Sequence, residues 1–254
     1  MRNSIDLRGK TIFISGAGAG LGKALVEKAH ALGCLSIWAG LRKGASPLPS
    51  WSRLVDQGAL SCVPFELTCS ESMAEAASKI PDLDILINNA AICNRGSIVN
   101  DSIDEMRHEF EVNYFGQIAA IQTFLPSLKR RQGLIVNVAS QLVHSAVPAI
   151  GNYCATKSAL LTASQAMRGD LAACGVSVCV VCPGALDTKM SRPFPTKKQD
   201  PLEAASEIFK ALEVTEGMVP IGQNARSLFE ILAHNPLAAE RAKRHLTYSF
   251  LWPE

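Results

Sequence analysis

The sequence predicts an α/β protein with a doubly wound, parallel β-sheet of about seven strands and helices on both faces, a three-layer αβα arrangement. Short apolar runs rich in β-branched residues alternate with helix-length amphipathic segments from Thr11 to Cys182. A glycine-rich turn follows the first of these runs directly. No internal repeat, low-complexity tract or linker divides the 254 residues, so we expect a single domain over residues 1–254.

Local patterns predict the first half of the chain as four strand–helix pairs. Each strand is a short apolar run, and each helix carries apolar residues along one face. Gly33 is placed to end the first helix with a positive φ, and Ser102 with Glu105 forms a capping box that starts the last one. The predicted strands are Thr11–Ser15, Leu35–Ala39, Leu60–Phe65 and Asp84–Ile87, and the helices are Lys23–Leu32, Trp51–Gln57, Ser70–Lys79 and Ser102–Leu128.

The second half continues with two strands and the helix between them: Leu134–Val138, Val176–Cys182 and Asn152–Cys174. Asp200 supplies an N-cap, Pro201 a first-turn proline and Glu203 a first-turn carboxylate, so another helix is expected there. Residues 225–254 predict a helical tail that breaks at Asn235-Pro236 and ends in an aromatic segment.

Composition and charge limit the function classes. The chain is 48% hydrophobic and 19% charged, as is usual for a globular protein, and its net charge of +2 gives no reason to expect nucleic acid. No apolar run reaches the roughly 18 residues that span a bilayer, and residues 1–6 do not resemble a signal peptide. The eight scattered cysteines suit reduced thiols, so we expect a cytoplasmic protein. Cys179 and Cys182 have redox-motif spacing, but a buried strand would point them to opposite faces.

The glycine-rich turn is a candidate phosphate-binding loop. Gly16, Gly20 and Gly22 have the spacing Gly-x-x-x-Gly-x-Gly. Glycines at such a turn let backbone N–H groups approach a pyrophosphate, whose charge the helix N-terminus stabilises. A tight turn without a ligand is the alternative, but the position after the first strand of a parallel sheet favours a dinucleotide.

The residues after the second strand bear on which nicotinamide cofactor is bound. An acidic residue there accepts a hydrogen bond from the ribose 2′-OH, whereas an arginine accommodates a 2′-phosphate. Gly40-Leu41-Arg42-Lys43 contains no carboxylate, and Arg42 lies about 20 positions beyond Gly22, the usual offset. An arginine without a role is the alternative. We therefore expect NADP(H), with NAD(H) as the second choice.

Tyr153 and Lys157 form a candidate acid/base pair. They are four residues apart in a predicted helix and so share a face. A free tyrosine phenol has a pKa of about 10, which a nearby lysine cation lowers toward neutrality. Because Tyr-x-x-x-Lys also arises by chance on solvated helices, the interpretation depends on the residues around the pair.

Together these motifs resemble the short-chain dehydrogenase/reductase family in its compact single-domain form, which has a Rossmann-type fold. The resemblance runs from about Leu7 to Lys189. It rests on motifs in the order of the family: Ser15 with the glycine loop, Asn88-Asn89-Ala90-Ala91, Asn113, Ser140, Tyr153 with Lys157, and Pro183-Gly184. Ser15 stands where the family has threonine, and Ala91 stands where it has glycine.

The resemblance implies a catalytic set of Asn113, Ser140, Tyr153 and Lys157. Tyr153 would exchange a proton with the carbonyl or alcohol oxygen, and Ser140 would hydrogen-bond that oxygen. Lys157 would lower the pKa of Tyr153 and bind the nicotinamide ribose, and Asn113 would hold a water that links Lys157 to solvent. The implied reaction interconverts an alcohol and a carbonyl by hydride transfer with the cofactor.

The resemblance also implies a cofactor site, with two departures from the family. Glu66 stands where members often have aspartate, and Ala19 stands where NADP-dependent members often have a basic residue. That leaves Arg42, with Lys43 and Ser15, to hold the phosphate. The residues expected at the cofactor are Ser15, Gly16, Gly18, Ala19, Gly20, Leu21, Gly22, Arg42, Glu66, Leu67, Asn89, Ala90, Ala91, Tyr153, Lys157, Pro183, Gly184 and Thr188.

Loops at the carboxyl ends of the strands are expected to select the substrate. The candidates are residues 94–96, residues 141–148 and a short lid near residues 185–199. No pocket carboxylate or arginine cluster stands out, so we expect a neutral or weakly polar substrate, and no histidine cluster has metal-ligand spacing, so we expect no metal. The candidate substrate contacts are Gln141, Leu142, His144, Ala185 and Leu186.

Assembly and alternative functions complete the expectations. The aromatic end Tyr248–Trp252 would reduce solubility if exposed, so it is expected to dock on its own domain or on a neighbouring subunit. The resemblance implies a homodimer or homotetramer through the helices at 102–128 and 152–174. A lyase or epimerase with a retained cofactor and a non-catalytic nucleotide-binding protein are the alternatives to an oxidoreductase.

Overall fold

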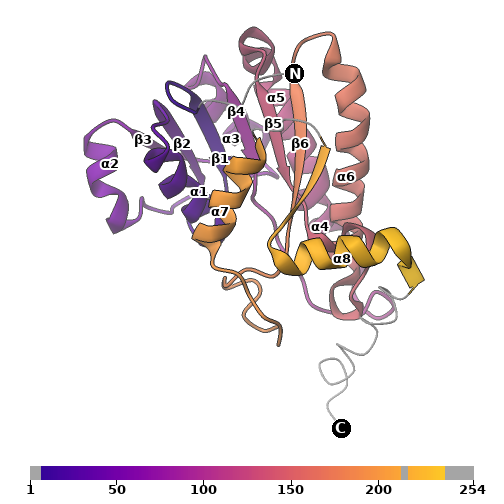
Figure 1. Ribbon diagram of the computed structural model, residues 1–254. Coiled ribbons are helices and arrows are strands. Elements are labelled where there is room, and N and C mark those ends of the chain that lie inside the picture. The colour runs from indigo at the N-terminus through magenta and orange to yellow at the C-terminus, as the bar shows by residue number, and fades with distance from the viewer. Residues whose placement is uncertain (1–6, 213–216, 238–254) are drawn as a thin grey trace.

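Seven parallel strands form one sheet in the computed structural model, which describes residues 7–212 and 217–237 (Figure 1). The strands are β1 (Thr11–Ser15), β2 (Ser36–Leu41), β3 (Leu60–Pro64), β4 (Ile85–Asn88), β5 (Leu134–Val138), β6 (Ser177–Pro183) and β7 (Gly217–Ile221). They lie in the order β3-β2-β1-β4-β5-β6-β7. The chain therefore winds outward from β1 on one side and from β4 on the other, which confirms the predicted doubly wound sheet.

Helices cover both faces of the sheet and complete the three layers (Figure 1). On one face α1 (Gly20–Ala31) packs against α7 (Pro201–Ala211). On the other face lie α3 (Ser70–Ser78), α5 (Gly116–Arg131) and α6 (Gly151–Ala172). The structure also describes the helices α2 (Ser52–Asp56), α4 (Ile103–Phe110) and α8 (Gln223–His234) and the 3₁₀ turns η1 (Pro49–Trp51), η3 (Gln141–His144) and η4 (Pro148–Ile150).

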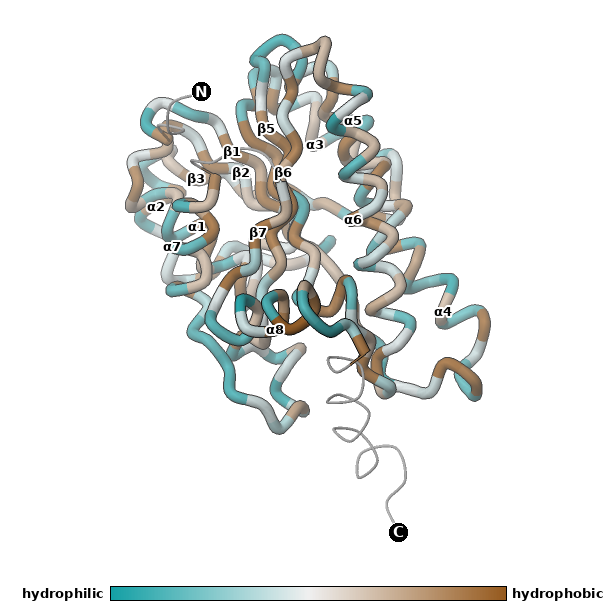
Figure 2. The backbone as a smooth tube through the Cα atoms, turned by 45° about the vertical axis from the view of Figure 1, so that its right-hand side comes forward, coloured by the Kyte–Doolittle hydropathy of each residue, from teal (hydrophilic) through white to brown (hydrophobic). Residues whose placement is uncertain are grey.

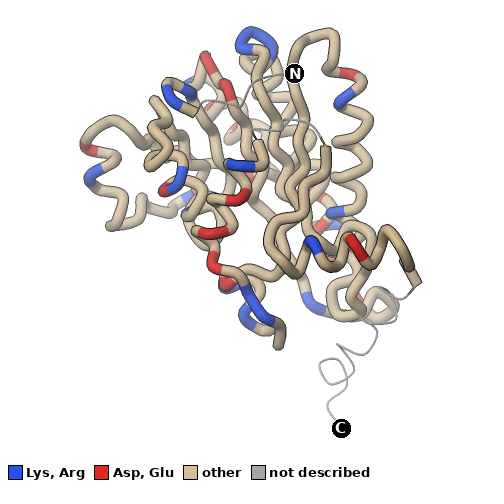
Figure 3. The backbone as a smooth tube through the Cα atoms, in the orientation of Figure 1, with Lys and Arg blue, Asp and Glu red and all other residues tan. Residues whose placement is uncertain are grey.

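Side chains of the central strands alternate between two hydrophobic clusters. Ile12 and Ile14 pack toward α1 and α7, whereas Phe13 points to the opposite face. The ring centroid of Phe13 lies 4.7 Å from those of both Phe65 and Phe124. Figure 2 shows hydrophobic residues along these strands, and Figure 3 shows the charged residues toward the periphery. The continuous apolar runs of the sequence are thus strands buried on both faces.

Most predicted elements are confirmed, with boundaries displaced by a few residues. α1 begins at Gly20 rather than at Lys23, so the last glycines of the loop lie in its first turn. The long helix predicted from Ser102 consists of α4, a π-helical turn η2 (Glu111–Phe115) and α5 in succession. A π-turn inside a helix often marks a functional position, and Asn113 lies at the centre of this one.

The hydrophobic pattern of the sequence predicts six of the seven described strands but does not predict β7. This strand contains a glycine and Pro220, and only Ile221 in it is buried. Proline has no N–H to donate and is tolerated at the edge of a sheet, where β7 lies. α8 ends at His234 with Asn235 as its C-cap, as predicted, and the aromatic end lies outside the described residues.

Cys179 and Cys182 point to opposite faces of β6, because they belong to different hydrophobic clusters. The buried-strand interpretation of their spacing is therefore confirmed. Among the described residues, no helix has the length and apolarity to cross a bilayer. In the same part of the chain, no group of three or more His, Cys, Asp or Glu side chains is placed to hold a metal ion.

Asp84 anchors the amino-terminal end of the sheet. Its side chain is nearly buried and accepts hydrogen bonds from the Thr11 backbone N–H at 2.9 Å, from Lys10 Nζ at 3.1 Å and from Arg131 Nε at 3.2 Å. Thr11 begins β1, Asp84 directly precedes β4 and Arg131 ends α5. One carboxylate therefore joins two strands and a helix.

Replacing Asp84 with asparagine is expected to lower the free energy of unfolding by about 2–4 kcal/mol, because two cations and a backbone N–H lose a charged acceptor. Urea denaturation measures this change. The control is Asp82→Asn, since Asp82 is exposed and has no described partner. Equal stability of the two variants would contradict the anchoring role.

Candidate active site

The glycine loop (residues 16–22) lies where the strand order reverses, between the carboxyl ends of β1 and β4. The Ser15 hydroxyl joins the two ends, because it accepts hydrogen bonds from the backbone N–H groups of Asn89 and Ala90, each at 3.0 Å. Asn89 Nδ2 donates in return to the carbonyl oxygens of Ser15 at 2.9 Å and Gly16 at 3.2 Å. These hydrogen bonds fix the ends of β1 and β4 relative to each other at the point where this sheet type binds its ligand.

Three positions in the loop leave no room for a side chain. A Cβ on Gly16 would lie 2.8 Å from the Ala90 Cα, and one on Gly20 would lie 2.9 Å from the Thr188 methyl group. A Cβ on Gly22 would overlap the Gly16 carbonyl oxygen. The close path of the backbone therefore requires glycine, and Thr188 of the predicted lid lies directly against the loop.

The N-terminus of α1 is open to an anion. Its N-cap is Ala19, no described side chain caps the end, and the first turn carries no acidic residue. The unpaired N–H groups and the positive end of the helix dipole therefore favour a bound phosphate. A Cβ on Gly18 would meet only a Leu41 methyl group, at 3.5 Å. This arrangement fits the diphosphate of a dinucleotide, which the backbone of residues 16–22 would hold.

The residues expected at the adenosine end differ in their surroundings. Arg42 directly follows β2 and is exposed, without a described partner for its guanidinium. Glu66 Oε1 accepts a hydrogen bond from the Lys43 backbone N–H at 2.8 Å, so this carboxylate closes the loop after β2. Leu67 packs in the core. Ser15 is fully buried and its hydroxyl is engaged between β1 and β4, so the expectation that it holds the phosphate is wrong.

Asn113, in the π-turn, connects the loop after β4 to α6. Its Oδ1 accepts from the Ile92 backbone N–H at 2.9 Å, and its Nδ2 donates to the Ile92 carbonyl at 2.8 Å and to Thr156 Oγ1 at 3.2 Å. Thr156 Oγ1 donates in turn to the Tyr153 carbonyl at 2.7 Å. Asn113 is fully buried, so it fixes the turn of α6 that carries Tyr153.

Lys157 is a buried amine beside the Tyr153 ring. It is 1% exposed, and its Nζ donates to the Val138 carbonyl at 2.8 Å and lies 5.8 Å from the centroid of the Tyr153 ring. Burial disfavours the charged form and lowers the pKa of Lys157 to about 8. The amine thus changes its charge near the physiological pH range.

Burial raises the pKa of the half-buried Tyr153 above its ordinary range. A hydrogen bond with the Ser140 side chain partly opposes the rise. Removal from water is the largest influence on this pKa, and the expected effect of Lys157 on it stays a prediction. Ser140 is 8% exposed and also accepts a hydrogen bond from the Leu142 backbone N–H at 3.2 Å.

The predicted substrate contacts differ in how far they are exposed. Gln141 Oε1 lies 3.3 Å from the position of a Cβ on Gly184, so the loops after β5 and β6 meet here. His144 is exposed, and its ring centroid lies 6.1 Å from that of Phe229. Leu186 is buried in the core beside α7, so it is not available to a substrate. The half-buried members of the set are Gln141, Leu142 and Ala185.

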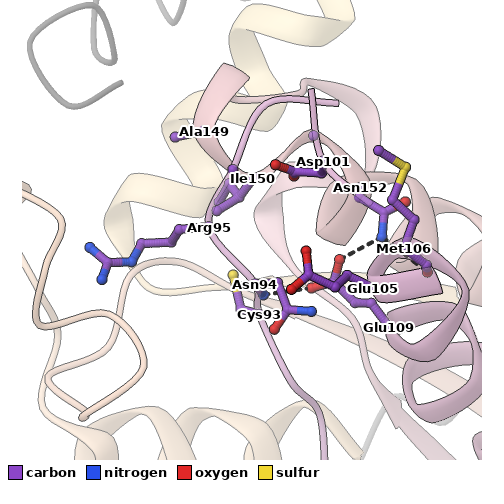
Figure 4. Close-up of a pocket in the computed structure, with 12 residues that line it drawn as sticks. Cys93, Asn94, Arg95, Asp101, Glu105, Met106, Glu109, Ala149, Ile150 and Asn152 are labelled. Carbon is purple, nitrogen blue, oxygen red and sulfur yellow. Dashed lines mark hydrogen bonds between the residues drawn. The ribbon is translucent and has the colours of Figure 1, made fainter. Parts of the chain in front are cut away.

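A cavity of about 490 Å³ opens between the loop after β4, the α4 helix and the start of α6 (Figure 4). Three carboxylates line it: Asp101, Glu105 and Glu109. In Figure 4 the Arg95 side chain points away from them. Neither Ser140 nor Tyr153 is among the residues that line this cavity, so the expectation of a neutral or weakly polar substrate stays a prediction. A helix pattern shows that Glu109 lies on α4 but not that the loop and α6 close over it.

The pKa of Lys157 is about 8 in the folded protein, against an ordinary value of 10.5. Between these two pH values, the free energy of unfolding of the protein without cofactor is expected to rise by about 3 kcal/mol relative to that of the Lys157→Met variant. The folded-state pKa is depressed, so in this window the unfolded chain binds more protons, and raising the pH favours the folded protein. Urea denaturation across this range measures the difference. Lys189→Met, at an exposed lysine, is the control and should show none; a flat difference for Lys157→Met would refute the lowered pKa.

Known proteins share both this sequence pattern and this structure. Residues 10–199 match the family model described as short chain dehydrogenase. The ketoacyl reductase HetN of Nostoc sp. is 30% identical over 236 residues, which are 86% of this chain and 80% of that protein. A short chain dehydrogenase from Burkholderia cenocepacia, solved in complex with NADP, is 33% identical with a TM-score of 0.84, and the match covers 92% of this chain and 97% of that one. The chain therefore belongs to the short-chain dehydrogenase/reductase family of oxidoreductases, whose members bind a nicotinamide cofactor.

Proposed function

We propose that the protein is an NADP(H)-dependent oxidoreductase that interconverts an alcohol and a carbonyl compound, with Tyr153 as the proton donor or acceptor. The observation that carries the proposal is the buried Lys157 amine 5.8 Å from the Tyr153 ring centroid, with Ser140 hydrogen-bonded to the same tyrosine. A phenol, a hydroxyl and an amine thus converge at the carboxyl edge of the sheet. A bound nicotinamide supplies or accepts the hydride.

The chain itself supplies proton transfer and orientation. In carbonyl reduction Tyr153 donates its phenolic proton to the developing alkoxide, and in alcohol oxidation it accepts the hydroxyl proton. Ser140 hydrogen-bonds the same substrate oxygen and holds it within reach. Lys157, as a cation, stabilises the phenolate left on Tyr153. Carbonyl reduction therefore requires a charged Lys157 and a protonated Tyr153. The rate of reduction falls as the pH rises through the lower of their two pKa values.

NADP(H) is the favoured cofactor because of Arg42. Its guanidinium is exposed directly after β2, where the 2′-substituent of the adenosine ribose lies in this sheet type. The relative from Burkholderia cenocepacia was solved with NADP, which supports the same choice. NAD(H) is the alternative, since Ala19, and not a basic residue, directly precedes Gly20.

The proposal extends to a single-domain, cytoplasmic protein that forms a homodimer or homotetramer through α4, α5 and α6. Phe115, on the η2 turn between two of these helices, is 55% exposed. A subunit contact through these helices would cover this ring.

The Tyr153→Phe variant is expected to lose about 10²- to 10⁴-fold in turnover because the proton donor is gone, with little change in cofactor affinity. NADPH oxidation measured over a set of aldehydes, ketones and quinones provides the assay, and cofactor binding is measured separately. The matched control is Tyr114→Phe, because Tyr114 is a half-buried tyrosine that packs against Phe115. Undiminished turnover in Tyr153→Phe would sink the proposed chemistry, and bound NADPH that no compound oxidises would favour a lyase or epimerase.

The Arg42→Ala variant is expected to bind NADPH about 10- to 100-fold more weakly, because a charge-assisted contact to the 2′-phosphate is lost. Its affinity for NADH should stay within a factor of about two, since NADH lacks that phosphate. The quenching of protein fluorescence during titration with each cofactor measures both affinities. Arg53→Ala, at another exposed arginine, is the control. If Arg42→Ala binds NADPH as tightly as the parent protein, Arg42 does not select the cofactor.

A further inference from the structure

Glu109 is a buried charged residue that the reaction scheme above does not use. It lies on α4 at the inner wall of the cavity and is 1% exposed, whereas Glu105 on the same helix is exposed. A buried carboxylate is costly unless it is hydrogen-bonded or paired with a cation. The burial of Glu109 therefore calls for a physical reason.

Both carboxylate oxygens of Glu109 accept hydrogen bonds, one from the loop after β4 and one from the first turn of α6 (Figure 4). The Asn94 backbone N–H donates to Oε1 at 2.8 Å, and Asn152 Nδ2 donates to Oε2 at 2.6 Å. Asn152 directly precedes Tyr153 in the first turn of α6. An oxygen pair that receives two N–H groups suits the ionised carboxylate, which can only accept.

Glu109 repeats the contacts that Asn113 makes one helical turn later. Each residue binds the backbone of the loop after β4, at Asn94 and at Ile92 respectively. Each also binds a side chain of α6, and the two partners, Asn152 and Thr156, stand on either side of Tyr153 in the sequence. The helix therefore holds the Tyr153 turn at two points, one neutral and one charged.

The charge of Glu109 also acts on the acid/base pair. Burial has the largest effect on Lys157 and lowers its pKa, whereas Cys182, Cys93 and Glu109 each raise it when they are ionised. Burial raises the pKa of both thiols to about 12, so Glu109 is the member of the three that is charged at neutral pH. It also makes a smaller contribution to the raised pKa of Tyr153. Burial raises the pKa of Glu109 itself, and its two hydrogen bonds partly offset this. The other titratable groups that act on Glu109, Tyr153 or Lys157 are Cys93 and Asp101 before α4, Cys154 on α6 and Cys182 on β6. Arg95 and Glu105 line the same cavity.

We propose that Glu109 is a positioning residue, which holds the Tyr153 turn of α6 against the loop after β4 and whose negative charge keeps Lys157 a cation. The inference rests on the proposed function, because it assumes that Tyr153 and Lys157 are the acid/base pair. Its two parts are separable. Glu109→Gln keeps the shape and an acceptor oxygen but removes the charge, and Glu109→Leu removes both.

The first test needs no substrate. In the protein without cofactor, Glu109→Gln is expected to lower the pKa of Lys157 in the folded state. The free energy of unfolding of Glu109→Gln is compared with that of the double variant Glu109→Gln/Lys157→Met across the pH range. The rise of this difference should begin at a lower pH than the corresponding rise in the parent protein relative to Lys157→Met. The onset moves to lower pH because the unfolded chain then binds one more proton than the folded protein over a wider range of pH. Glu105→Gln, one turn away in the same cavity, should leave the onset where it is in the parent protein. An unchanged onset in Glu109→Gln would overturn the electrostatic part.

The second test is kinetic and uses the carbonyl compound with the highest turnover in the NADPH-oxidation screen. Glu109→Leu is expected to lose about 10- to 100-fold in kcat, since a small displacement of the proton donor is costly, with NADPH affinity unchanged. Glu109→Gln should retain most of kcat at neutral pH and show the alkaline fall of kcat/KM at lower pH than the parent. Asn152→Ala, which removes the other half of the contact, should reproduce the kcat loss if Glu109→Leu fails to fold.

The outcomes distinguish this inference from the proposed function. The positioning role would be refuted if Glu109→Leu had the kcat and pH profile of the parent protein. If Glu109→Leu does not fold, the same result in Asn152→Ala would refute it. An inactive Tyr153→Phe variant would leave the proposed function intact in either case. An active Tyr153→Phe would instead remove the proposed function. The pH dependence of stability would then still decide whether Glu109 acts on Lys157.

Discussion

The burial of the Lys157 amine beside Tyr153 is the constraint on which the site depends. Removing an ammonium group from water is costly, and here burial brings its pKa to about 8. The structure offsets this with one strong acceptor, the Val138 carbonyl at 2.8 Å at the end of β5. A lysine held between its charged and neutral forms responds to whatever binds next to it.

Buried polar contacts make the carboxyl edge of the sheet rigid. Asn88 Nδ2 on β4 donates to Asn137 Oδ1 on β5 at 3.0 Å, and Asn137 Nδ2 donates to Ser164 Oγ on α6 at 2.8 Å. All three residues are fully buried. Ser15 performs the same task between β1 and β4. The strands and α6 are thus joined by directional bonds rather than by apolar packing alone, so a hydride donor and a proton donor can be held at a set distance.

The fold and the central residues of the site could be predicted because they have local signatures. Parallel strands buried on both faces appear as unbroken apolar runs, and the glycine loop has a spacing that few other structures require. Pro220, on an edge strand, weakened the signal for β7. Leu186 stood in a loop expected to contact substrate, yet it packs in the core, and Ser15 stood beside the phosphate loop, yet its hydroxyl faces β4.

The sequence by itself determined the order of elements, the family and the positions of Ser140, Tyr153 and Lys157, because each of these depends on spacing along one strand, turn or helix. Only the tertiary structure decided the environment of those residues. Whether a tyrosine is in water or in the protein interior depends on segments far apart in the chain, and burial here raises the pKa of Tyr153. The surroundings of Glu109 also depend on the tertiary structure. Asn94 and Asn152 both donate hydrogen bonds to its carboxylate because the loop after β4 and α6 meet at α4.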